Sequence, residues 1–173
     1  MGVITKNLDD LINLISEFDT SKLVNAIHES GVEIKLVDLH QAIGITTPDT
    51  IYFDKTNVKS ISSKKLLFVI LHEFAHYKRI KKANIDVDEF IKDSSEKEYI
   101  KFVINEEIIA DRYASIQFNN ITKELFPSWD MQNLHLESKQ KIYSDRLKAF
   151  YAYLQDNPEL KYSDLIKTHI IND

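Results

Sequence analysis

The sequence predicts an α+β fold that is mostly helical and carries a small sheet on its N-terminal side. Apolar residues recur at helical spacing along much of the 173-residue chain. Only segments 32–39 and 50–54 have the composition typical of strands, with Val, Ile and Tyr prominent. The chain contains 3 Gly and 3 Pro, too few for a turn-rich β sandwich. Its length suits one domain with a sizeable core, so we expect a single domain over 1–173.

The N-terminal third should contain helices followed by a strand pair. Residues 7–30 read as one or two helices, interrupted near 19–21 and ending before Gly31. Segments 32–39 and 50–54 are expected to pair as strands, with a turn at Pro48 and Asp49 between them. This predicts a helical lead-in over 1–30, ahead of a core that begins at residue 31.

The rest of the chain should be helical. Serines at 60, 62 and 63 offer N-caps for a helix over about 64–82, and 83–94 reads as a loop with room for a short helical turn. Ser95 and Glu98 form a capping box that starts a helix reaching about Phe118. Residues 119–134 look irregular. Helices over 137–155 and 163–171, separated by Asn157 and Pro158, complete the C-terminal part, 121–173.

Composition excludes several classes of function. The net charge of -5 argues against direct nucleic-acid binding, and the cluster Lys78, Arg79, Lys81 and Lys82 reads as a solvated helix end whose cations complement the helix dipole. The absence of cysteine excludes disulfides and thiolate metal sites, so a metal must be held by His, Asp or Glu. The chain shows no secretory signal, myristoylation pattern or membrane-spanning apolar run, so we expect a cytoplasmic protein.

The segment HEFAH contains the first chemical motif. On a helix, His72 and His76 lie on one face a turn apart, so both imidazoles can converge on one ion. Glu73 points about 100° away from His72, near such an ion but not on it. Two imidazoles that hold zinc, with a carboxylate placed to take a proton from water, are typical of a zinc hydrolase.

The surroundings of the motif bear on this interpretation. Four apolar residues form the expected core stripe of this helix: Leu67, Ile70, Leu71 and Phe74. His72 and His76 then lie opposite, flanked by Phe68 and Val69, and polar groups among apolar neighbours need partners. A metal supplies one. The alternative is a pair of core histidines bonded to the backbone or to carboxylates.

A third ligand is available on the next long helix. Glu106 and Glu107 compete for this role. Glu107 shares its face with Ala110 and Ala114, which let another helix approach closely, whereas Glu106 points toward a different face. We therefore favour Glu107, although either glutamate alone fits a solvated helix face.

One turn beyond Glu107 lies Asp111. From there its carboxylate can accept a hydrogen bond from the free ring nitrogen of a zinc-binding histidine, which would fix the tautomer and orient the ring.

The two motifs together resemble those of the gluzincins, and most closely the ImmA/IrrE family of small bacterial and phage metallopeptidases. The similar features are a strand pair, H-E-x-x-H at 72–76 and E-x-x-A-D-x-Y-A at 107–114, and the resemblance covers about 32–118. It implies a minimal zincin-like fold, bound Zn²⁺ and endopeptidase activity on a protein or peptide, often a DNA-binding repressor in that family.

The resulting hypothesis is a zinc metallopeptidase with Glu73 as general base and His72, His76 and Glu107 as metal ligands. A second oxyanion donor stays unassigned among Tyr77, Tyr113, His135 and His40. Two alternatives remain open at this point. One is a non-catalytic, metal-bound module that binds a regulatory protein, and the other is a helical interaction protein without metal.

Overall fold

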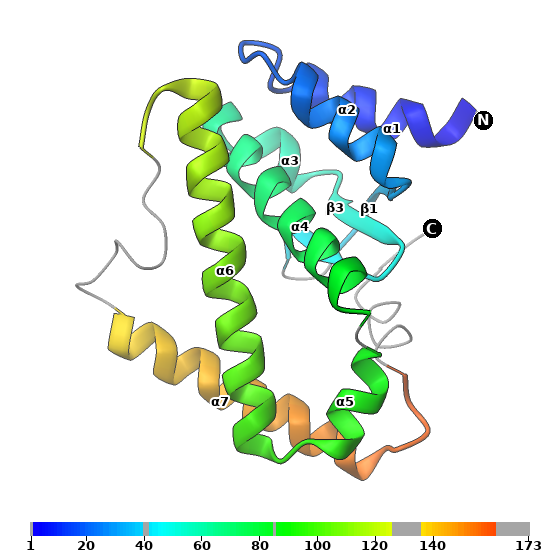
Figure 1. Ribbon diagram of the computed structural model, residues 1–173, viewed down its shortest axis with the longest axis vertical. Coiled ribbons are helices and arrows are strands. Elements are labelled where there is room, and N and C mark those ends of the chain that lie inside the picture. Colours follow the sequence, from blue (N-terminus) through cyan, green and yellow to red (C-terminus); the bar gives the residue numbers. More distant parts are fainter. Residues whose placement is uncertain (1, 40–41, 85, 126–135, 162–173) are drawn as a thin grey trace.

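A computed structural model describes residues 2–39, 42–84, 86–125 and 136–161. It confirms the mostly helical α+β architecture with a small N-terminal sheet (Figure 1). The helices Ser63–Ala83 and Glu96–Thr122 run through the centre, and the sheet and the first helices lie to one side of them (Figure 1). The helices Val87–Asp93 and Leu136–Asp156 lie at the lower end of the view (Figure 1). None of the described helices is long and apolar enough to cross a membrane.

The N-terminal part contains two helices and three strands. Helices α1 (Gly2–Asn13) and α2 (Ser21–Ser30) confirm the predicted interruption near 19–21. The strands are β1 (Glu33–Val37), β2 (Gly44–Thr46) and β3 (Thr50–Asp54), in the spatial order β1-β3-β2. The sheet is mixed because β3 pairs parallel with β1 and antiparallel with β2.

The predicted pairing of the two longer strands is confirmed, with Ile34 opposite Ile51 in the parallel register. The prediction missed β2, which spans only three residues and has no apolar alternation to mark it. This short strand forms an edge of the sheet and contacts the helix that carries HEFAH. It therefore brings the sheet up to the candidate site.

The HEFAH helix, α4 (Ser63–Ala83), is flanked by the caps that the sequence indicates. Ser62 accepts a hydrogen bond from the backbone N–H of Lys65 at 3.2 Å, and Asn84 ends the helix in the left-handed conformation with φ 48°. The second long helix, α6 (Glu96–Thr122), begins with the expected Ser95–Glu98 capping box. It extends four residues beyond the predicted end near 118, to Thr122.

Three further helices complete the described part of the chain. Helix α3 (Asn57–Ser60) is a single turn that the sequence did not reveal, and α5 (Val87–Asp93) occupies the predicted loop. Helix α7 (Leu136–Asp156) matches the first predicted C-terminal helix. The second, over 163–171, lies outside the described residues, as does most of the irregular segment 119–134.

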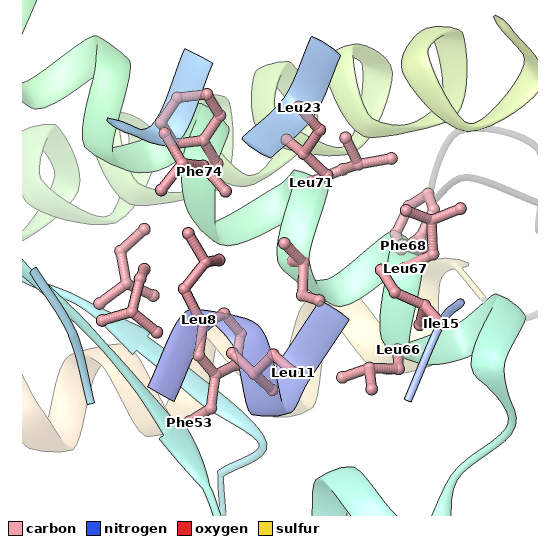
Figure 2. Packing of buried hydrophobic residues seen from close by; sticks show 14 of the residues in the cluster. Leu8, Leu11, Ile15, Leu23, Phe53, Leu66, Leu67, Phe68, Leu71 and Phe74 are labelled. Atoms are coloured by element: carbon pink, nitrogen blue, oxygen red, sulfur yellow. The ribbon is translucent and has the colours of Figure 1, made fainter. Parts of the chain in front are cut away.

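Among the residues that the structure describes, buried apolar side chains form two separate clusters. The larger one joins α1, the sheet, α4 and the C-terminal half of α6, and Figure 2 shows Leu11, Phe53 and Phe74 among its members. The predicted stripe on α4 belongs to it, since Leu67, Ile70, Leu71 and Phe74 are all buried. The smaller cluster joins α5, α6 and α7 around four buried residues: Ile91, Tyr99, Leu147 and Leu154. One face of the HEFAH helix is thus buried in the core, and His72 and His76 lie on another face.

Candidate metal centre

Three side chains converge between α4 and α6. The Nε2 atoms of His72 and His76 lie 3.0 Å apart. Glu107 on α6 reaches both rings, with Oε2 3.2 Å from Nε2 of His72 and Oε1 3.1 Å from Nε2 of His76. All three side chains are partly buried. The structure thus brings together the two histidines and the favoured glutamate, in a group that can hold a metal ion.

Small residues on α6 explain why the helices approach closely enough for these contacts. Ala110 and Ala114 have no exposed surface, and they lie on the same face of α6 as Glu107. A helix pair with small residues at its contact allows a short carboxylate side chain to reach across. This is the close approach that the sequence predicted.

Asp111 completes the support of one ring. Its Oδ1 accepts a hydrogen bond from Nδ1–H of His72 at 2.9 Å, and the residue is only 5% exposed. With one proton held on Nδ1, the neutral imidazole would direct the lone pair of Nε2 toward a metal at the centre of the triad. The carboxylate therefore sets both the tautomer and the orientation of the His72 ring.

The charges of the site shift the pKa of His72 upward. Burial alone would lower this pKa, but hydrogen bonds to Asp111 and Glu107 outweigh it. The negative charge of Glu73 adds to the effect, and the pKa of His72 rises to about 10. The stabilisation from this proton is fully present below the usual pKa of 6.5 and is lost as the pH rises through about 10. Without a metal, His72 is therefore protonated at neutral pH.

The pKa of Glu107 moves in the opposite direction. Burial alone would raise it, but hydrogen bonds from His72 and His76 outweigh burial and lower it to about 2. The stabilisation from this carboxylate is present above its usual pKa of 4.5 and is lost as the pH falls toward about 2. The negative charges around His72 thus favour a cation at this position. In the metal-free protein the cation is the protonated imidazole, and a bound metal ion would replace its proton.

The donor set fits zinc. A tetrahedral ion with bonds of about 2.0–2.1 Å to nitrogen and oxygen separates its donors by about 3.3 Å. Here the two Nε2 atoms lie 3.0 Å apart, and each lies 3.1–3.2 Å from a different oxygen of the Glu107 carboxylate. Two imidazoles and one carboxylate also leave a fourth position for water or substrate, as catalytic zinc sites do.

Glu73 does not belong to the triad and is held by the sheet instead. The Thr46 hydroxyl on β2 lies 2.6 Å from Oε2 of Glu73, to which it donates, and 3.0 Å from the backbone carbonyl of the same residue. Gly44 allows the same side chain to lie close to the strand, because a Cβ at this position would be only 2.8 Å from Cγ of Glu73. The sequence did not indicate a role for Thr46 or Gly44, because the strand that carries them has no recognisable pattern.

Glu106, the rejected ligand candidate, has a different partner. It receives two hydrogen bonds from Arg79, each at 2.7 Å, from Nε and Nη2. The bidentate pair ties α4 to α6 one turn from the triad. Arg79 is therefore not simply part of a solvated helix end, as the basic cluster suggested. The charge pattern of the sequence did not indicate this ion pair, because Glu106 lies on a helix that is far from Arg79 in the sequence.

The two described candidates for a second oxyanion donor, Tyr77 and Tyr113, have other hydrogen-bond partners. The Tyr77 hydroxyl donates to the backbone carbonyl of Ser30 at 3.0 Å, on the packed side of α4. The Tyr113 hydroxyl accepts from Lys78 at 3.3 Å. His40 and His135 lie outside the described residues.

A cavity of about 540 Å³ opens beside the triad. His72, Glu73, His76 and Glu107 form one part of its wall, and β2 contributes Gly44, Ile45 and Thr46. A ligand in this cavity would therefore contact the possible metal site, the Glu73 carboxylate and the edge strand together.

Comparisons of the chain with protein-family models, with curated proteins and with solved structures found no match.

Proposed function

We propose that this protein is a zinc-dependent endopeptidase. The observation that carries the proposal is the position of Glu73. Its carboxylate is not used as a ligand of the His72–His76–Glu107 triad, yet it lines the same cavity and is held there by Thr46. A carboxylate held apart from the ligands, but beside them, is what a general base in a zinc hydrolase requires.

The position of strand β2 is evidence that the substrate is a polypeptide. Strand β2 pairs with β3 on one side only, and its three residues line the cavity. An extended peptide can add to such an edge through backbone hydrogen bonds, which recognise a main chain of any sequence. The resemblance to the ImmA/IrrE family makes DNA-binding repressors the first protein substrates to test.

The residues of the chain divide the work of hydrolysis. A zinc ion held by His72, His76 and Glu107 supplies Lewis-acid polarisation of a carbonyl and of water. Glu73 accepts the proton of the attacking water as the new C–O bond forms at the carbonyl carbon. The same carboxylic acid then donates this proton to the leaving amine nitrogen as the C–N bond breaks. Thr46 keeps the carboxylate directed into the cavity.

Replacing Glu73→Gln tests the assignment. We expect the cleavage rate of a quenched-fluorescent peptide library to fall by about 10²–10⁴-fold, because the base is lost. Zinc content should stay unchanged, since no ligand is removed. Glu29→Gln, an exposed glutamate on α2, is the matched control and should cleave at the wild-type rate.

Two outcomes would redirect the proposal. Full turnover by Glu73→Gln would show that another group acts as base. If zinc binds but neither the wild type nor a chelated and reloaded sample cleaves any peptide or repressor, the protein is a metal-bound binding module instead.

A further inference from the structure

The cavity continues well beyond the candidate metal centre. From the triad it extends toward α5 and α7, where its wall becomes apolar. Six apolar side chains from α5, α6 and α7 line this far part: Val87, Phe90, Phe102, Val103, Leu147 and Phe150. Four of them (Val87, Val103, Leu147 and Phe150) belong to the smaller cluster. This apolar pocket is built from segments outside the H-E-x-x-H motif.

The apolar pocket offers little to a charged ligand. Among the described residues of the wall, Arg79 and Glu106 are the charged side chains outside the candidate centre, and they neutralise each other through two hydrogen bonds. A polar or charged group that entered would lose its hydration without gaining a partner. A large apolar group would remove its own surface and that of the aromatic walls from water.

We propose that the apolar pocket binds a large apolar side chain of the substrate, such as Phe, Leu or Met, next to the bond that is cleaved. The inference rests on the proposed endopeptidase function for the identity of the ligand. The continuity of the pocket with the triad supports it, because a peptide whose carbonyl lies at the triad can direct a neighbouring side chain into the same cavity. The volume of about 540 Å³ is in the range of pockets that enclose small organic ligands.

The size of the pocket selects against small residues as well as polar ones. An alanine side chain would leave most of the apolar wall in contact with water, whereas an aromatic ring would cover it. Adding several methylene equivalents of buried surface gives discrimination of at least about tenfold. Cleavage sites should therefore carry a bulky apolar residue on one side of the bond, whatever the wider sequence.

The test separates binding from catalysis. Zinc-loaded Glu73→Gln protein is titrated with N-acetyl-phenylalanine amide and N-acetyl-alanine amide, and binding is followed by the NMR signals of valine and leucine methyl groups. We expect the phenylalanine compound to bind at least about tenfold more tightly and to shift the Val103 and Leu147 methyls. Equal affinity for the two compounds, or shifts elsewhere only, would overturn the proposal.

A second experiment uses a variant in which the apolar pocket is filled. Val103→Trp should reduce the preference to about twofold or less, because the indole occupies the apolar pocket. Ile116→Trp on the same helix is the matched control, since Ile116 is 60% exposed and lies away from the cavity wall. Val87→Trp on α5 serves the same purpose if Val103→Trp does not fold. Retained preference in a folded filled variant would contradict the proposal.

Cleavage of a peptide library by the wild-type protein tests the apolar pocket and the endopeptidase function separately. Cleavage beside small or charged residues overturns the apolar pocket while leaving the endopeptidase function intact. A strong preference for the phenylalanine compound in binding, without cleavage of any peptide, supports the apolar pocket and contradicts the endopeptidase function.

Discussion

The interface between α4 and α6 has two halves of opposite chemistry. In the half near the start of α4, the rings of Phe68 and Phe118 meet edge to face with their centroids 6.5 Å apart. Phe118 and Ala114 of α6 are almost completely buried. This half consists of apolar side chains that pack against the larger cluster, so its contribution is to stability.

From one to three turns further along α4, the interface is ionic. The His72–His76–Glu107 triad, the Asp111 hydrogen bond and the Arg79–Glu106 pair all lie within this second half. Buried ionic groups lose hydration and stabilise a fold less than apolar residues of the same volume. The comparison indicates that the apolar half holds the helices together, whereas the ionic half presents the possible metal site.

Removing an aromatic side chain from the apolar half should have the largest effect on stability. Phe118→Ala is expected to lower the free energy of unfolding by about 3–5 kcal/mol, because a fully buried ring is lost and a cavity remains. Denaturant unfolding monitored by circular dichroism measures this. The zinc affinity of the folded fraction should not change.

Ile116→Ala is the control on the same helix. Its side chain is 60% exposed, so the free energy of unfolding should change by no more than about 0.5 kcal/mol. A loss below about 1 kcal/mol for Phe118→Ala would remove the distinction between the two halves.

Neutralising the carboxylate in the ionic half should change metal binding more than stability. Asp111→Asn weakens the hydrogen bond that orients His72, so zinc affinity should fall by about 10–100-fold. Competition with a chromophoric chelator measures the affinity. Asp145→Asn, an exposed change on α7, should leave it unaltered. Unchanged affinity in Asp111→Asn would show that this carboxylate does not support the ligand.

The smallest expected effect concerns the contact of β2 with the ionic half. Thr46→Val keeps the shape of the side chain but removes the hydrogen bond to Glu73, so kcat should fall by about tenfold. KM and zinc affinity should remain unchanged because no metal ligand is removed and the cavity wall keeps its shape. Thr46→Ser restores the hydroxyl and should restore kcat. A Thr46→Val protein with wild-type kcat would rule out this positioning role.

Periodicity made most of the fold predictable. The stripe of apolar residues on α4 and the capping box before α6 define their elements locally, so the two long helices emerge from the sequence alone. Strand β2 and helix α3 did not, because three and four residues are too few to carry a pattern. Their conformation depends on the tertiary neighbours against which they pack.

The candidate site shows the same division. The spacing of His72 and His76 and the alanine-bearing face of α6 predict which side chains meet, since both follow from helix geometry. The Arg79–Glu106 pair, the support of Glu73 by Thr46 and the apolar pocket join segments far apart in the chain. Such contacts depend on how elements pack, and a single sequence does not encode that packing in any local pattern.

The proposed function depends on one zinc ion held by His72, His76 and Glu107. Calorimetric titration of the metal-free protein with zinc near pH 7, in two buffers of different ionisation enthalpy, tests it most directly. We predict one ion per chain and the release of about one proton, because the raised pKa of His72 leaves that ring protonated before the metal binds. His76→Ala should abolish this binding. An absence of saturable binding at one ion per chain in the wild-type protein would contradict the claim.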